Sequence, residues 1–147
     1  TENGPKVLEI NARMGDPETQ VFMKILDSDL LEIILACVNQ DLHNVKVKWK
    51  DKYACCVTLV SGGYPESCKT GFEISGLNNI TDKDTTIFHS ETKLIEGKLI
   101  TNGGRVLGIT STGNSLKEAI DKAYTAVDQI NFEGMYFRKD IGFKSLN

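Results

Sequence analysis

The sequence lacks any long apolar run and any run of basic residues. Its 147 residues contain no stretch of about 18 apolar side chains, which a membrane-spanning helix would require. The formal net charge is only -3, and no Lys/Arg run or basic stripe is present. These absences give no reason to expect a nucleic acid or a membrane as a partner.

Metal-binding side chains are also scarce. No C-x-x-C pair occurs among the four cysteines, and the two histidines, His43 and His89, lie far apart. We therefore expect no zinc site, and we expect reduced thiols in a cytoplasmic protein. The four cysteines are Cys37, Cys55, Cys56 and Cys68.

An initiating Met and a signal peptide are missing from the beginning of the sequence. Residues 1–5 read Thr-Glu-Asn-Gly-Pro, without the charged-then-apolar pattern of a leader. Such a start is typical of a turn inside a fold. The composition is otherwise that of a globular protein, with 40% hydrophobic and 25% charged residues. A chain of this length buries roughly 70% of its unfolded surface, enough for one core.

The first third of the chain predicts a strand and two helices. Apolar residues after Gly-Pro predict a strand over 6–10. Asp16 is the expected N-cap of a helix with Pro17 at its first position. Asp29, with Glu32 three residues on, predicts a second helix start of the capping-box type. That helix should bury one stripe, made of Leu30, Ile33, Ile34, Cys37 and Val38.

The rest of the chain predicts short strands followed by one long helix. The expected strands cover residues 53–60, 72–74, 85–89, 93–95, 98–101 and 105–110, and Glu96-Gly97 fits a tight hairpin turn. Ser115 and Glu118 form a second capping box before a helix with an apolar stripe at Leu116, Ala119, Ile120, Ala123 and Val127. Clustered strands joined by hairpins favour the α+β class over a doubly wound sheet.

Polar side chains on the first predicted strand form the candidate chemical site. Glu9 and Asn11 are two residues apart, so they share one face of a strand. A carboxylate and an amide oxygen suit Mg²⁺, and Arg13 continues that face as a donor to a phosphate. The same pattern also fits the solvated face of an edge strand, and Asp16 fits a simple helix cap.

Residues 7–20, Val-Leu-Glu-Ile-Asn-Ala-Arg-Met-Gly-Asp-Pro-Glu-Thr-Gln, closely resemble the signature of the glycinamide ribonucleotide synthetases, also called phosphoribosylamine–glycine ligases. The specific part is Arg-x-Gly-Asp-Pro-Glu, from Arg13 to Glu18. Residues 101–107, 132–134 and 138–142 are similar to further segments of the family. Met14 stands where the family usually has Phe or Leu, and His89-Ser-Glu-Thr matches a family His-Ala-Gly-Thr turn only in part.

The resemblance implies an ATP-grasp enzyme that uses ATP and Mg²⁺, or Mn²⁺, to join glycine to 5-phosphoribosylamine. It implies that residues 1–27 end the ATP-grasp core and that residues 28–147 form a β-rich C-terminal domain with flanking helices. The N-terminal domain and the lid over ATP would lie upstream, so we expect the isolated chain to be inactive. No Gly-rich phosphate loop of the G-x-x-x-x-G-K type is present.

Site roles follow from the same resemblance. Glu9 and Asn11 would hold the metal, and Arg13 would stabilise the acyl phosphate and the oxyanion. Gly15, Asp16 and Glu18 would contact substrate, with Asp16 and Glu18 orienting an amine.

Arg105, which follows two glycines, is expected at the ribose 5-phosphate together with Gly104. A surface Arg at a strand start is the alternative for Arg105. For Arg138 and Lys139 the favoured interpretation is a structural salt bridge, either to Asp140 or to a neighbouring domain. A binding or interaction module without catalysis remains the alternative function.

Overall fold

A three-stranded antiparallel sheet organises the molecule. The computed structural model describes residues 1–146, and the sheet has the order β1-β5-β2, where β1 is Tyr53–Val60, β2 is Thr85–His89 and β5 is Arg105–Gly113. The register pairs Val57 with Ile109 across β1 and β5. The central position of β5 explains its near-complete burial, since it has a neighbour on each side.

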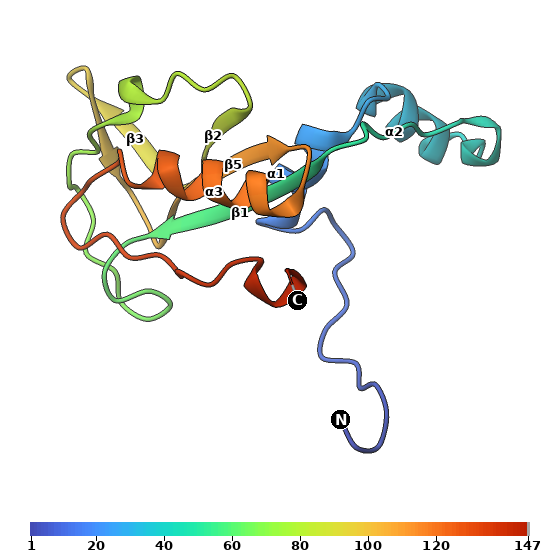
Figure 1. Cartoon of the computed structure of the whole chain (residues 1–147), viewed down its shortest axis with the longest axis horizontal. Helices are drawn as coiled ribbons and strands as arrows, with labels where there is room; N and C mark the ends of the chain where they lie inside the picture. The colour runs from blue at the N-terminus through green and yellow to red at the C-terminus, as the bar shows by residue number, and fades with distance from the viewer. Residues whose placement is uncertain (147) are drawn as a thin grey trace.

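One face of the sheet is covered by α3, Leu116–Val127, which lies across the strands in Figure 1. The Ser115 hydroxyl accepts from the Glu118 N–H at 3.1 Å, so the predicted cap is confirmed. The buried side chains of α3 pack with alternate residues of β1 into the main core. The core members from these two elements are Cys55, Val57, Leu59, Ala119, Ile120, Ala123, Ala126 and Val127.

The opposite face of the sheet lies against α1, Glu18–Ile25. Cys56, Thr58 and Val60 of β1 point to this side, because side chains alternate along a strand. A separate hairpin pairs β3, Thr92–Ile95, with β4, Lys98–Thr101. Glu96 and Gly97 have φ values of 47° and 79°, which a two-residue hairpin turn of the predicted kind requires.

Short elements complete the description. Single 3₁₀ turns cover η1, Leu42–Asn44, η2, Leu77–Asn79, and η3, Phe143–Ser145. The α+β class with antiparallel pairing is therefore confirmed. Residues 72–74 contribute only an isolated bridge, between Glu73 and Ile100, where a strand was predicted. No helix within residues 1–146 is both long and apolar enough to cross a membrane.

Several predictions for the first third are wrong. Residues 6–10 form no strand and run away from the body as an open segment (Figure 1), because no neighbouring strand offers them a ladder of hydrogen bonds. Pro17, not Asp16, is the N-cap of α1, and no side chain caps that helix.

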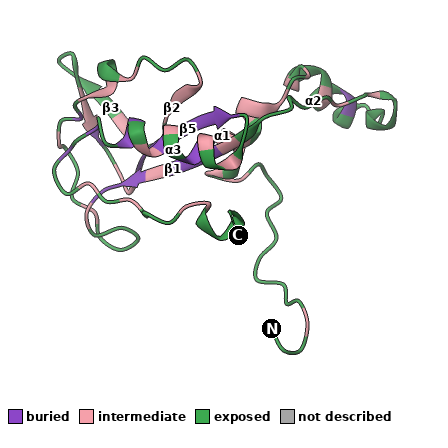
Figure 2. Ribbon diagram, viewed as in Figure 1, coloured by how far each residue is buried: buried purple, intermediate pink, exposed green. Residues whose placement is uncertain are grey.

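The second helix, α2, Leu30–Val38, begins at Asp29 as predicted, and the Asp29 carboxylate accepts from the Leu31 N–H at 2.7 Å. Its expected buried stripe is wrong. Ala36 is its one buried residue. Residues 26–50, which include α2, form an arm that Figure 2 shows to be mostly exposed. The arm extends away from the sheet, so nothing in the described residues covers its apolar face.

Candidate functional site

The candidate site is built around Arg105, the first residue of β5. Its Nη1 lies 3.3 Å from Asp16 Oδ2 and also donates to the Asp16 carbonyl oxygen. The two residues are 89 positions apart in sequence. The structure thus brings together two residues that were predicted as site residues from separate motifs. Asp16 lies in the segment before α1, and Arg105 lies in the central strand.

A tyrosine that the sequence reasoning missed holds the Arg105 guanidinium. Arg105 Nε donates to Tyr64 Oη at 2.8 Å, and the guanidinium carbon lies 5.8 Å from the ring centroid, within cation–π range. The hydrogen bond to Tyr64, together with the Asp16 carboxylate, raises the pKa of Arg105. Arg105 is therefore a permanent cation with a fixed orientation.

The glycine before Arg105 makes room for this tyrosine. A Cβ on Gly104 would meet Tyr64 Cδ2 at 2.5 Å, closer than real Cβ atoms come to a neighbour. The backbone N–H of Arg105 is also engaged, since it donates to Glu91 Oε2 at 3.1 Å. This backbone N–H is therefore occupied by a carboxylate of the chain itself.

A cavity of about 440 Å³ lies beside Arg105 on the sheet face opposite α3. Burial raises the pKa of the Cys56 thiol in its wall, so this thiol is a poor nucleophile. Arg138, also in the wall, makes a two-pronged ion pair with Asp140 at 2.9 and 2.8 Å, as predicted. The lining is Pro17, Cys56, Thr58, Val60, Tyr64, Arg105, Tyr136, Phe137, Arg138 and Ile141.

Asp16 lines a second cavity, of about 430 Å³. The second cavity is formed by the segment before α1, by α1 itself and by the end of β2, with Gly15, Gln20 and His89 in its wall. Asp16 Oδ1 accepts from Gln20 Nε2 at 2.8 Å, which orients the carboxylate within this wall. His89 Nδ1 is 3.1 Å from Thr92 Oγ1, a local contact that assigns it no chemical role.

The predicted metal ligands lie in the open N-terminal segment. Asn11 Nδ2 donates to Glu9 Oε1 at 3.1 Å, so the two side chains do lie next to each other. Arg13 Nη1 donates to the Met14 carbonyl oxygen at 3.1 Å, and all three residues are exposed. Within residues 1–146 no contact joins them to Arg105, and no cluster of three His, Cys, Asp or Glu side chains could hold a metal.

This donor set still fits a magnesium ion bound with phosphates. Mg²⁺ commonly takes one or two protein oxygens and completes its shell with phosphate and water. Glu9 supplies a carboxylate, and a turned Asn11 amide supplies a carbonyl oxygen.

The Glu18 carboxylate lies against Gly15, at the start of α1, where a Cβ on Gly15 would come within 2.2 Å of its Oε2.

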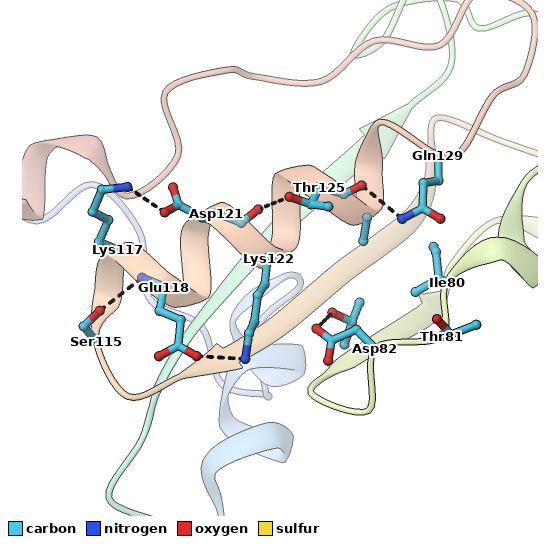
Figure 3. A pocket seen from close by; sticks show the side chains of 12 residues that line it. Ile80, Thr81, Asp82, Ser115, Lys117, Glu118, Asp121, Lys122, Thr125 and Gln129 are labelled. Atoms are coloured by element: carbon cyan, nitrogen blue, oxygen red, sulfur yellow. Dashed lines mark hydrogen bonds and ion pairs between the residues drawn. The ribbon is translucent and has the colours of Figure 1, made fainter.

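A further cavity of about 440 Å³ lies between α3 and residues 80–85, the segment that leads into β2 (Figure 3). Its cations are already paired: Lys122 Nζ is 2.6 Å from Asp84 and 2.9 Å from Glu118, and Lys117 is 2.6 Å from Asp121. The hydrogen bonds from Lys122 lower the pKa of Asp84 and Glu118. Both lysines are thus already engaged by carboxylates of the protein itself, so we assign this hollow a structural role.

Comparison with known proteins gives the family. Residues 54–144 match the family described as phosphoribosylglycinamide synthetase, C domain. The chain is 50% identical over 141 residues to the phosphoribosylamine–glycine ligase of Caldanaerobacter subterraneus, covering 96% of this chain and 33% of that protein. It is 46% identical over 147 residues to a bifunctional purine biosynthetic protein of Schizosaccharomyces pombe, covering all of this chain and 18% of that protein.

A solved structure agrees with these sequence matches. The crystal structure of phosphoribosylamine–glycine ligase from Thermotoga maritima superposes with a TM-score of 0.71 at 34% identity, over 92% of this chain and 33% of that one. The class is therefore that of α+β domains found within larger polypeptides. The chain belongs to the phosphoribosylglycinamide synthetase family and carries its C domain. It spans about a third of the length of the single-activity relatives that it matches.

Proposed function

We propose that this chain acts as the C-terminal part of an ATP-dependent ligase that joins glycine to 5-phosphoribosylamine, giving glycinamide ribonucleotide, ADP and phosphate. The observation that carries the proposal is the contact between Arg105 and Asp16. It links the Arg-x-Gly-Asp-Pro-Glu motif, which precedes the family match, to the central strand of the C domain. The names of the relatives, which are ligases of this reaction, support the same assignment.

The reaction requires two bond exchanges, and the chain offers a group for each. In the first, a glycine carboxylate oxygen attacks the γ-phosphorus of ATP and ADP leaves. Glu9 and Asn11 would hold Mg²⁺ or Mn²⁺, which when bound neutralises phosphate charge. In the second, the amine nitrogen attacks the acyl carbon and phosphate leaves, with Arg13 as donor to the developing oxyanion.

Arg105 is assigned to the ribose 5-phosphate. Its Nε and Nη1 are engaged by Tyr64 and Asp16, and its Nη2 has no hydrogen-bond partner among the described residues. A guanidinium held in this way loses little freedom when it binds a phosphate. Asp16, Glu18 and Gly15 lie together at the start of α1 and would orient the amine and contact substrate, and Gly104 would contact substrate beside Arg105.

The domain assignment belongs to the same proposal. Residues 1–27 would complete an ATP-grasp core and residues 28–147 would form the C-terminal domain. The open course of residues 6–10 supports this division, because a strand needs a neighbour and the resemblance supplies one in the upstream sheet. The partners of the intact enzyme would be ATP, glycine, phosphoribosylamine and the upstream domains, and its compartment would be the cytoplasm.

The test is a chimera in which this chain replaces the matching third of the Caldanaerobacter ligase. We expect ADP release that requires both glycine and phosphoribosylamine, and none from the isolated chain. Glu9→Ala should abolish turnover at ordinary Mg²⁺. Arg105→Met should raise the KM for phosphoribosylamine about tenfold or more, with little change for ATP, since a charge-assisted hydrogen bond contributes about 1.5–3 kcal/mol.

Lys98→Met is the matched control, because Lys98 is also an ion-paired cation but lies on the β3–β4 hairpin, paired with Glu73. It should leave both KM values unchanged. A chimera that folds and binds ATP yet releases no ADP would contradict the proposal. If that chimera still bound phosphoribosylamine, the alternative function, a non-catalytic binding module, would replace the ligase proposal.

A further inference from the structure

Four apolar side chains form an exposed stripe along α2. Leu31, Ile34, Leu35 and Val38 are spaced i, i+3, i+4 and i+7, so they lie on one side of the helix. Their exposed fractions are 61%, 47%, 50% and 74%. A helix of a folded protein normally buries such a stripe, because that burial is the main source of its stability.

The arm that carries α2 is fixed at its base, so the stripe has a defined place on the molecule. The Asp27 N–H donates to the Lys48 carbonyl at 3.0 Å, and the Lys50 N–H donates to the Ile25 carbonyl at 2.8 Å. Phe22 of α1 and Trp49 of the returning segment meet edge to face, with centroids 6.4 Å apart. These contacts anchor the arm on α1, and Figure 1 shows α2 extending away from the sheet.

The distribution of burial indicates what covers the stripe. Of residues 1–53 only Ala36 is buried, whereas residues 54–146 contain the whole core. The C-domain match begins at residue 54, so the arm lies outside it. The ligases that match the arm as well as the C domain are about three times as long as this chain. The uncovered apolar side chains thus belong to the part of the chain that adjoins the rest of such a polypeptide.

We propose that the α2 stripe is a docking surface for the upstream two-thirds of a full-length ligase polypeptide, packed against an apolar patch on that part. This inference rests on the proposed function for the identity of the partner. The stripe carries no charged side chain, and Glu32 lies outside it, so an apolar partner surface fits it. Docking would hold the C domain, and with it Arg105, at a set position relative to the upstream domains.

The experiment is a binding titration. The Caldanaerobacter ligase without its matching third is titrated with this complete chain, and the complex is detected by sedimentation velocity. We expect Leu35→Asp and Val38→Asp each to weaken association at least 100-fold, because each places a charge in an apolar interface. Leu94→Asp is the matched control, since Leu94 is 68% exposed but lies on the β3–β4 hairpin, and it should bind like the unaltered chain.

Circular dichroism establishes that each variant keeps its helix content, which is expected because the changed side chains are exposed. No binding by the unaltered chain, or equal binding by Leu35→Asp, overturns the docking surface. Self-association that Leu35→Asp abolishes, without a complex with the upstream part, overturns it in favour of a second copy of the chain.

Glycine-dependent ADP release from the same mixture separates this proposal from the proposed function. A stripe-dependent complex that releases no ADP supports docking and contradicts the ligase assignment. ADP release that is unaffected by Leu35→Asp supports the ligase and contradicts docking.

Discussion

At the scale of single residues, the site depends on Gly104, whose lack of a side chain makes room for the Tyr64 ring. The Tyr64 ring occupies the space that a side chain at Gly104 would need, and the Tyr64 hydroxyl then meets Arg105 Nε. Cys68 Sγ closes the other side, 3.4 Å from the same hypothetical Cβ. Gly104 therefore acts through Tyr64, by letting the ring reach the guanidinium.

Gly104→Ala should accordingly destabilise the fold by about 1–3 kcal/mol, the usual cost of overpacking. The measurement is urea denaturation followed by circular dichroism. The control is a double-mutant cycle with Tyr64→Ala, which removes the clashing ring, so the effect of Gly104→Ala should largely disappear in that background. Equal losses in both backgrounds would show that the ring is not the cause.

The candidate site could be predicted only where a motif marked it. Asp16 and Arg105 both stand in recognisable motifs, and the structure brings them into contact. Tyr64 and Glu91 were missed because each meets Arg105 only through the fold, across 41 and 14 positions of sequence. The single available signal for Tyr64 was its place in the Ser61–Pro65 turn, and a turn alone does not indicate where its aromatic side chain points.

At the scale of elements, two helices with similar caps differ in what they cover. Ser115 caps α3, whose buried face forms part of the main core. Asp29 caps α2, which has one buried residue and lies outside that core. The same local interaction should therefore affect global unfolding differently, because a cap adds to the stability of the unit that unfolds with it.

Ser115→Ala should lower the global free energy of unfolding by about 1 kcal/mol, the typical effect of losing an N-cap. Asp29→Ala, the matched control, should change the global transition much less and instead speed amide hydrogen exchange within α2. Urea denaturation and exchange detected by NMR give the two readouts. Equal losses of global stability would mean that α2 unfolds together with the core.

Elements were predictable where local pattern and tertiary environment agree. The strands at 53–60, 85–89 and 98–101 and the Glu96-Gly97 turn were predicted correctly, since each has its partner strand within the chain. The strand over 6–10 was wrong because a strand requires a neighbour, which periodicity does not reveal. The α2 helix was predicted correctly, but its burial was not, for the same reason. An apolar stripe indicates that a helix face packs against something, but it does not identify the partner.

At the scale of the whole molecule, one cluster of charges joins the outer helix to the sheet. Lys122 of α3 reaches Asp84, just before β2, and Glu118 one turn back on its own helix. The cluster lies at the edge of the core, with the Lys122 side chain 28% exposed, so solvent screens it only in part. It connects α3 to the segment just before β2, and these two elements are separated along the chain by β3, β4 and β5.

The pH dependence of folding should report this connection. Hydrogen bonds from Lys122 lower the pKa of Asp84 and Glu118, so their contribution to stability is complete above the ordinary carboxyl range and is lost as pH falls through the lowered values. The same bonds raise the pKa of Lys122, so the cation persists through neutral pH. The connection should therefore hold from about pH 5 to beyond pH 9 and weaken progressively as the pH falls below about 4.

We expect Lys122→Met to lower the thermal midpoint at pH 7. The gap in midpoint to the unaltered chain should narrow as the pH falls below about 4 and the carboxylates of Asp84 and Glu118 take up protons. Differential scanning calorimetry from pH 3 to pH 8 measures this. Lys117→Met is the control, because its pair with Asp121 lies within α3 alone and joins no two layers. A gap between Lys122→Met and the unaltered chain that stayed constant with pH would mean that Lys122 acts through the packing of its methylene stem and not through its charge.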